Sequence, residues 1–170
     1  MSQRQRLQLT FALGLCLFAA VAGAQGPIGH WPLDGDATDI SGNALDGTLT
    51  GNVVPTEGHD GVSSSALRFG GGGTDLVDVG DRPELRLTGA MTLAAWAWLD
   101  AGNANNGRII AKMGGGGSRS WSLCVEASLD GIPNRPNFQI SPDGAAVIGL
   151  PGQASAPTDE WFHMAGVYRP

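Results

Sequence analysis

Acidic and amide side chains gather in one short glycine-containing segment near the amino terminus. The segment holds Asp34, Asp36, Asp39 and Asn43, with Asp46 close behind. Calcium takes about six to eight oxygen ligands from carboxylates, amides and carbonyls, and a loop bent at glycines can supply them. Asp and Asn side chains also cap backbone N–H groups in ordinary turns. The sequence therefore predicts either a calcium site at Asp34, Asp36, Asp39 and Asn43 or a solvated turn.

The sequence contains no recognisable pair of catalytic carboxylates. A retaining glycosidase holds its two carboxyl groups about 5 Å apart, which on one strand requires acidic residues at alternating positions. Glu126 and Asp130 come nearest, but Asp130 belongs to an Asp-Gly turn. His30, His59 and His163 occur in unrelated contexts, without the close spacing of zinc ligands or a neighbouring nucleophile motif. We therefore expect this chain to have no catalytic residues.

Tryptophan side chains are the other candidates for ligand contact, because the indole face that packs a core also stacks on a pyranose ring. Trp96 and Trp161 lie inside strand-like runs, so we expect them in the core. Trp98 and Trp121 fit the core and a ligand-binding surface equally well. The glycine runs 70–73 and 114–117 lack the Lys and Ser or Thr of a phosphate-binding loop, which favours plain strand connections.

The amino-terminal residues have the pattern of a secretory signal peptide. Arg4 and Arg6 precede an apolar stretch over 11–21, and small residues follow at 22–24. The stretch is shorter than the roughly 20 residues that span a bilayer, so we expect no retained membrane anchor. Residues 1–24 are therefore predicted to be removed, together with Cys16. Residues 25–170 then form one domain that is secreted, periplasmic or on the cell surface.

The mature chain is acidic and keeps one cysteine. Loss of Arg4 and Arg6 changes the formal charge from −6 to −6 − 2 = −8. Nucleic acid and anionic membranes are poor partners for this chain, because binding them requires clustered Lys and Arg. Cys124 is expected to be a small buried side chain. The alternative is a disulfide with an unknown partner outside this sequence.

Short strands are the elements that must position these residues. Nine apolar clusters are separated by Gly, Pro and Asp turn signals: His30–Leu33, Ala66–Phe69, Leu76–Val79, Met91–Leu99, Arg108–Met113, Trp121–Glu126, Asn137–Ile140, Ala145–Leu150 and Trp161–Tyr168. With 27 glycines and 10 prolines, the composition favours an all-β protein, and we expect an antiparallel two-sheet β-sandwich. The run from Met91 is apolar on both sides, which predicts a strand covered on both faces. Asp143-Gly144 is the clearest hairpin signal.

Six segments, in one collinear order, resemble the laminin-G-like jelly-roll family. They are His30–Gly35, Asp39–Asn43, Gly47–Thr48, Ser65–Gly70, Met91–Trp96 and Trp161–Tyr168. The resemblance implies a sandwich of the concanavalin A-like lectin/glucanase superfamily, in which secreted and cell-surface proteins carry non-catalytic binding or adhesion modules. It also implies a glycan or an extracellular protein as ligand, and it favours calcium at the acidic loop.

Such domains continue with further strands after the one that resembles Trp161–Tyr168, so we expect the chain to be part of a longer domain. Where the family has a disulfide, Cys124 could form one half of it.

Several functions stay open on sequence alone. A binding module predicts an exposed Trp beside polar groups, whereas a purely structural segment of a surface protein predicts every Trp to be buried. An accessory domain of a larger secreted enzyme, such as a glycoside hydrolase, is a further alternative.

Overall fold

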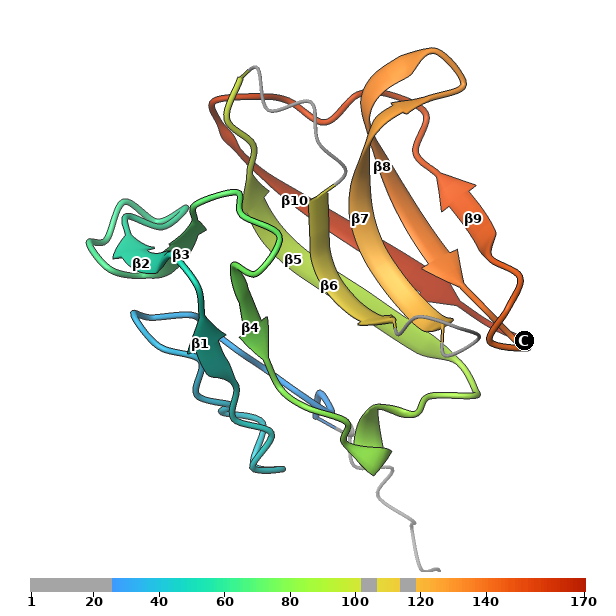
Figure 1. Ribbon diagram of the computed structural model, residues 1–170, viewed down its shortest axis with the longest axis horizontal. Coiled ribbons are helices and arrows are strands. Elements are labelled where there is room, and N and C mark those ends of the chain that lie inside the picture. Colours follow the sequence, from blue (N-terminus) through green and yellow to red (C-terminus); the bar gives the residue numbers. More distant parts are fainter. Residues whose placement is uncertain (1–25, 102–106, 114–118) are drawn as a thin grey trace, which may run out of the picture.

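Two packed β-sheets dominate the computed structural model, which describes residues 26–101, 107–113 and 119–170 (Figure 1). Its elements are β1 (Thr48–Thr50), β2 (Val53–Thr56), β3 (Ala66–Phe69), β4 (Leu76–Asp78), the short 3-10 helix η1 (Pro83–Leu85), β5 (Met91–Trp98), β6 (Gly107–Met113), β7 (Arg119–Leu129), β8 (Ile132–Ile140), β9 (Ile148–Pro151) and β10 (Trp161–Tyr168). All strand pairs in the described residues are antiparallel. The predicted all-β antiparallel sandwich is confirmed.

The larger sheet contains β6, β7, β8 and β9 in that order. A two-residue turn at Asp130 and Gly131 joins β7 to β8, and both residues have positive φ, 52° and 77°. That conformation matches the twist of a tight hairpin. β9 begins only at Ile148, because the Asp143 carboxylate accepts the backbone N–H groups of Ala145 and Ala146 and keeps both residues in the turn.

The second sheet consists of β5 and β10, with Trp161 opposite Trp98 and Tyr168 opposite Met91. β10 packs on β8, and β5 packs on β6 and β7 (Figure 1). The core between the sheets is formed by Leu93, Trp121, Leu123, Val125, Phe138, Ala156 and Met164. Gly166 permits the close approach of the layers, because a Cβ there would lie 2.4 Å from the Phe138 ring.

Two small ribbons lie beside the sandwich. β1 pairs with β4 and β2 pairs with β3. The predicted strand at His30–Leu33 is absent from the described structure. Trp31 instead anchors this segment by donating its indole N–H to the Leu45 carbonyl at 2.8 Å, and Leu45 is fully buried.

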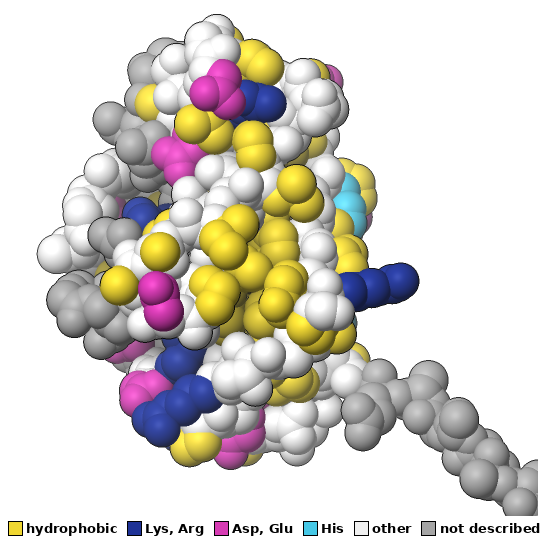
Figure 2. Space-filling model, turned by 90° about the vertical axis from the view of Figure 1, so that its right-hand side faces the viewer, with side chains coloured by type: hydrophobic (Ala, Val, Ile, Leu, Met, Phe, Trp, Pro, Cys, Tyr) yellow, Lys and Arg dark blue, Asp and Glu magenta, His cyan; other side chains and the backbone are white. Residues whose placement is uncertain are grey.

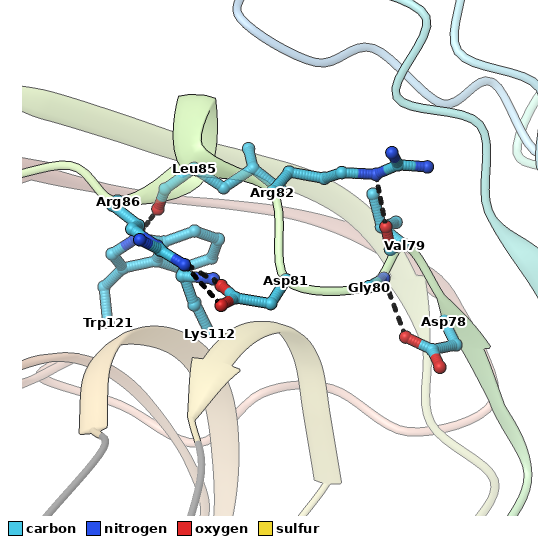
Figure 3. A network of polar contacts seen from close by, with 9 residues as sticks. All are labelled: Asp78, Val79, Gly80, Asp81, Arg82, Leu85, Arg86, Lys112 and Trp121. Carbon is cyan, nitrogen blue, oxygen red and sulfur yellow. Dashed lines mark hydrogen bonds and ion pairs between the residues drawn. The ribbon is translucent and has the colours of Figure 1, made fainter.

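A polar network fixes the connection from β4 to β5 against the larger sheet (Figure 3). The Asp81 carboxylate binds Arg86 at 2.6 Å and Lys112 of β6 at 2.5 Å. Hydrogen bonds from Arg86 and then from Lys112 lower the pKa of Asp81 to about 2. Trp121 of β7 donates its indole N–H to the Leu85 carbonyl at 3.1 Å. The network therefore holds η1 on β6 and β7.

Candidate functional site

Five aromatic side chains gather on the outer face of the β5–β10 sheet, and we call them the aromatic cluster. Its members are His59, Trp96, Trp98, Trp161 and His163. Trp96 and Trp98 come from β5 and are 51% and 46% exposed. Trp161 and His163 lie opposite them on β10, and His59 comes from the loop between β2 and β3. The cluster is therefore built mainly from alternate residues of two paired strands.

The rings contact one another edge to face. Centroid distances are 4.4 Å for His59 and Trp96, 5.3 Å for Trp96 and His163, and 5.9 Å for Trp98 and Trp161. The interplanar angles of these pairs lie between 62° and 78°. Such contacts contribute about 0.5–1.5 kcal/mol each beyond the area they bury. The rings thus hold one another in place while the two β5 tryptophans stay half exposed.

Charged groups lie beside the rings. Trp98 donates its indole N–H to Asp100 Oδ1 at 3.1 Å, and Asp100 Oδ2 accepts a hydrogen bond from Arg68 Nη2 at 2.7 Å. Both charged side chains are about half exposed or more, 62% for Arg68 and 47% for Asp100. The pair orients the Trp98 ring and leaves further N–H donors of Arg68 for a ligand.

The structure corrects three predictions about the tryptophans. Trp121 is 3% exposed and its N–H binds the Leu85 carbonyl, so it is a core residue and no ligand contact. Trp96 and Trp161 were expected in the core, but Leu93 and Ala97 of β5 and Met164 of β10 point inward. Trp96 and Trp161 therefore lie on the outer face, where Trp161 contacts Trp98. The β5 strand is consequently covered on one face only, and the prediction of a doubly covered strand is wrong.

The acidic loop is organised around the buried carboxylate of Asp39. Its Oδ1 accepts the backbone N–H groups of His30 and Ser41, both at 2.9 Å. Its Oδ2 accepts the Leu45 N–H at 3.0 Å and the Ser41 hydroxyl at 2.8 Å. Burial opposes the charge, but the hydrogen bonds from His30, Leu45 and Ser41 outweigh it and hold the pKa of Asp39 well below its ordinary value. Asp39 therefore acts as a structural anchor.

The other candidate calcium ligands also make hydrogen bonds within the protein. Asp36 Oδ1 accepts the Thr38 N–H, Asp46 Oδ1 accepts the Asp39 N–H, and Asn43 donates to the Ile28 carbonyl. Asp34 lies in the same loop, exposed. Within the described ranges, no three or more His, Cys, Asp or Glu residues are grouped so that they could hold a metal ion. Calcium binding by this loop stays a prediction, and Asp39 is unsuited as a ligand because both its oxygens already serve backbone donors.

Cys124 is a buried free thiol that donates to the Asn137 carbonyl at 3.4 Å. Burial and then the charge of Glu126 raise the pKa of the Cys124 thiol to about 11. The expectation of a small buried side chain is confirmed, while a disulfide with a partner outside this sequence stays a prediction. Glu126 accepts a hydrogen bond from Gln139, and Asp130 binds Arg135, so the two acids have separate partners.

Two shallow cavities lie away from the aromatic cluster, near the carboxyl-terminal end of β10. One of about 220 Å³ lies between residues 90–92 and 167–169, and one of about 300 Å³ includes Met91, Ile140 and Tyr168 in its lining. Neither is lined by a ring of the aromatic cluster.

In the part of the chain that the structure describes, no helix is long and apolar enough to span a membrane. The proposed signal peptide, 1–24, and the glycine run 114–117 lie outside the described residues.

A laminin G family model, described as the concanavalin A-like lectin/glucanases superfamily, matches residues 70–170. The match covers more than half of the chain, including both sheets of the sandwich and all of the aromatic cluster except His59. No curated protein and no solved structure gives a significant match.

Proposed function

The chain belongs to the concanavalin A-like lectin/glucanases superfamily, and from that membership we propose that it is a non-catalytic module whose aromatic cluster binds glycans. The observation that carries this proposal is the placement of Trp96 and Trp98, each about half exposed, on one sheet face in contact with three further rings. Contiguous exposed apolar surface with a polar rim is typical of an interaction site.

The chemistry of the cluster suits a sugar. A pyranose ring presents C–H groups on its faces and hydroxyl groups around its rim. The indole rings offer large, rigid apolar surfaces for the C–H groups. Asp100 can accept hydrogen bonds from hydroxyl groups, and Arg68 can donate to them. Apolar stacking and polar recognition are therefore available at adjacent positions.

The negative net charge of the chain favours neutral glycans over anionic ones as ligands. The formal net charge is −6 over the whole sequence, and a field of that sign disfavours polyanionic ligands such as sulfated glycans. We therefore propose neutral glycans as the preferred ligands. The signal-peptide pattern at 1–24 supports a role outside the cytoplasm, where such glycans are displayed.

Substitution of Trp98 by Ala tests the proposal. On an array of neutral and sulfated glycans, the unmodified chain should bind neutral glycans, and Trp98→Ala should weaken binding about tenfold or more, as expected for the loss of one or two kcal/mol of stacking. Phe69→Ala is the matched control, because Phe69 is an exposed aromatic residue (41%) outside the cluster. Absence of glycan binding by the unmodified chain, or equal losses for the two variants, would refute the proposal.

A further inference from the structure

The ribbon of β2 and β3 supplies polar groups along one side of the aromatic cluster. Figure 1 shows this ribbon beside β5. The His59 ring, from the loop between β2 and β3, lies 4.4 Å from the Trp96 ring of β5. Arg68 of β3 binds Asp100, which follows β5, at 2.7 Å. Because β10 separates β5 from any further strand beside β10, such a strand would leave these contacts as they are.

The loop that carries His59 is held in one shape by its own hydrogen bonds. Asp60 Oδ1 accepts the Val62 N–H at 3.0 Å and the Ser65 hydroxyl at 2.7 Å. The Gly58 N–H donates to the Val62 carbonyl at 3.1 Å, and a Cβ at Gly58 would collide with the Ser65 hydroxyl. The loop therefore presents the imidazole of His59 to the cluster before any ligand binds.

Two imidazoles contact the half-exposed ring of Trp96. Besides His59, these contacts include His163, which lies opposite Trp96 on β10 with ring centroids 5.3 Å apart. Both imidazoles are exposed, and Figure 2 shows a histidine side chain at the surface next to hydrophobic side chains. Imidazole is the side chain whose charge ordinarily changes between about pH 5 and 8. Acidification therefore adds positive charge within the cluster itself.

The other charged groups near His59 belong to its own loop, to β10 and its preceding residue, and to the Trp98 end of the cluster. They are Glu57 and Asp60, then His163 and Glu160, then Arg68 and Asp100. The side chains of β5 are all uncharged. Asp60 serves donors of its own loop, and Asp100 serves Trp98 and Arg68. Since both carboxylates have partners within the protein, a carboxylate on the ligand is a suitable counter-ion for a protonated His59.

On the premise that the cluster binds glycans, we propose that at acidic pH it also binds glycans that carry carboxylates, such as uronic acids, through His59 and Arg68. The net charge of −6 opposes such ligands at neutral pH. Protonation of all three histidines changes the formal charge to −6 + 3 = −3, and two of these charges lie in the cluster. Arg68 has further N–H donors in the planar arrangement that suits a carboxylate.

Calorimetric titration of the full chain with uronic acid oligosaccharides and with their methyl esters tests this proposal. The ester removes the negative charge and keeps the sugar ring, so it is the matched neutral ligand. We expect the acids to bind about threefold more tightly at about pH 5 than at about pH 7.5, as one exposed ion pair would give. The affinity for the esters should change by less than about 1.5-fold over the same range, since they offer no charge to pair with an imidazolium.

Two histidine variants separate a local effect from one of net charge. His59→Gln should remove most of the gain in affinity for the acids on acidification. His30→Gln loses the same titratable charge, but His30 is an exposed residue of the amino-terminal loop, so the gain should persist. Arg68→Gln should weaken binding of the acids at both pH values, because the guanidinium is charged throughout this range.

The esters separate failure of this proposal from failure of glycan binding as such. If the esters bind but the affinity for the acids does not rise on acidification, the role of His59 is refuted and glycan binding stands. Equal gains in His59→Gln and His30→Gln would attribute the rise to net charge and would also overturn the proposal. If neither acids nor esters bind at either pH, both proposals fail together.

Discussion

Replacement of Asp39 by Asn measures how much one carboxylate contributes to the fold of the amino-terminal loop. Two hydrogen bonds end on each oxygen of Asp39. The amide keeps one oxygen and places an NH2 group against two donors, so two of the four bonds are lost. A hydrogen bond to a charged group contributes about 1.5–3 kcal/mol. Two such bonds amount to about 3–6 kcal/mol, and we take about half of this as the net cost, because water can hydrate the loop around the amide, which leaves about 1.5–3 kcal/mol.

Thermal unfolding monitored by tryptophan fluorescence is the assay. For a domain of this size, about 1.5–3 kcal/mol corresponds to a fall in Tm of roughly 5–10 °C. Asp143→Asn is the matched control, because Asp143 also accepts two backbone N–H groups, but in an exposed turn. We expect its Tm to change by less than about 2 °C. Equal Tm values for Asp39→Asn and the unmodified chain would refute the structural role of Asp39.

The stability difference between the unmodified chain and Asp39→Asn should depend on pH, and the direction follows from the lowered pKa of Asp39. A carboxylate whose pKa is lower in the folded state stabilises the fold above its unfolded pKa of about 3.9, and this contribution is lost as the pH falls toward the folded value. The difference in Tm between the unmodified chain and Asp39→Asn should therefore be constant from pH 7 to about pH 5 and shrink below about pH 4. A difference that stays constant down to pH 2 would show that the charge of Asp39 is not responsible.

Three further predictions concern calcium, processing and catalysis. If the acidic loop binds calcium with ordinary extracellular affinity, roughly 2 mM calcium should raise Tm by about 4–7 °C, and equal Tm values in calcium and in chelator would contradict the predicted site. The intact mass of the secreted protein should correspond to a chain that begins at Gln25, and a product that retains Cys16 would contradict the signal-peptide prediction. A reducing-sugar assay with β-glucan should show no turnover, and turnover that Glu126→Gln abolishes would reveal a catalytic carboxylate.

Most strands could be predicted from sequence because one buried face imposes a side-chain period of two. The observed bounds of β3 and β10 equal the predicted ranges. β8 is longer than predicted, because Pro133 and Pro136 resemble strand breakers although the tight turn at Asp130 and Gly131 pairs this segment with β7. β1 and β2 were missed because they are short and largely exposed, so burial leaves no alternation in their sequences.

The aromatic cluster was only partly predictable. The spacing of Trp96 and Trp98 indicates a shared face, but tryptophan is usually buried and the sequence favours placing Trp96 inside. The space between the sheets decides otherwise, since Gly166 already lies against the Phe138 ring and the inner face of β5 has room for Leu93 and Ala97. His59 carries no local signal, because its contact with Trp96 depends on where the loop between β2 and β3 lies.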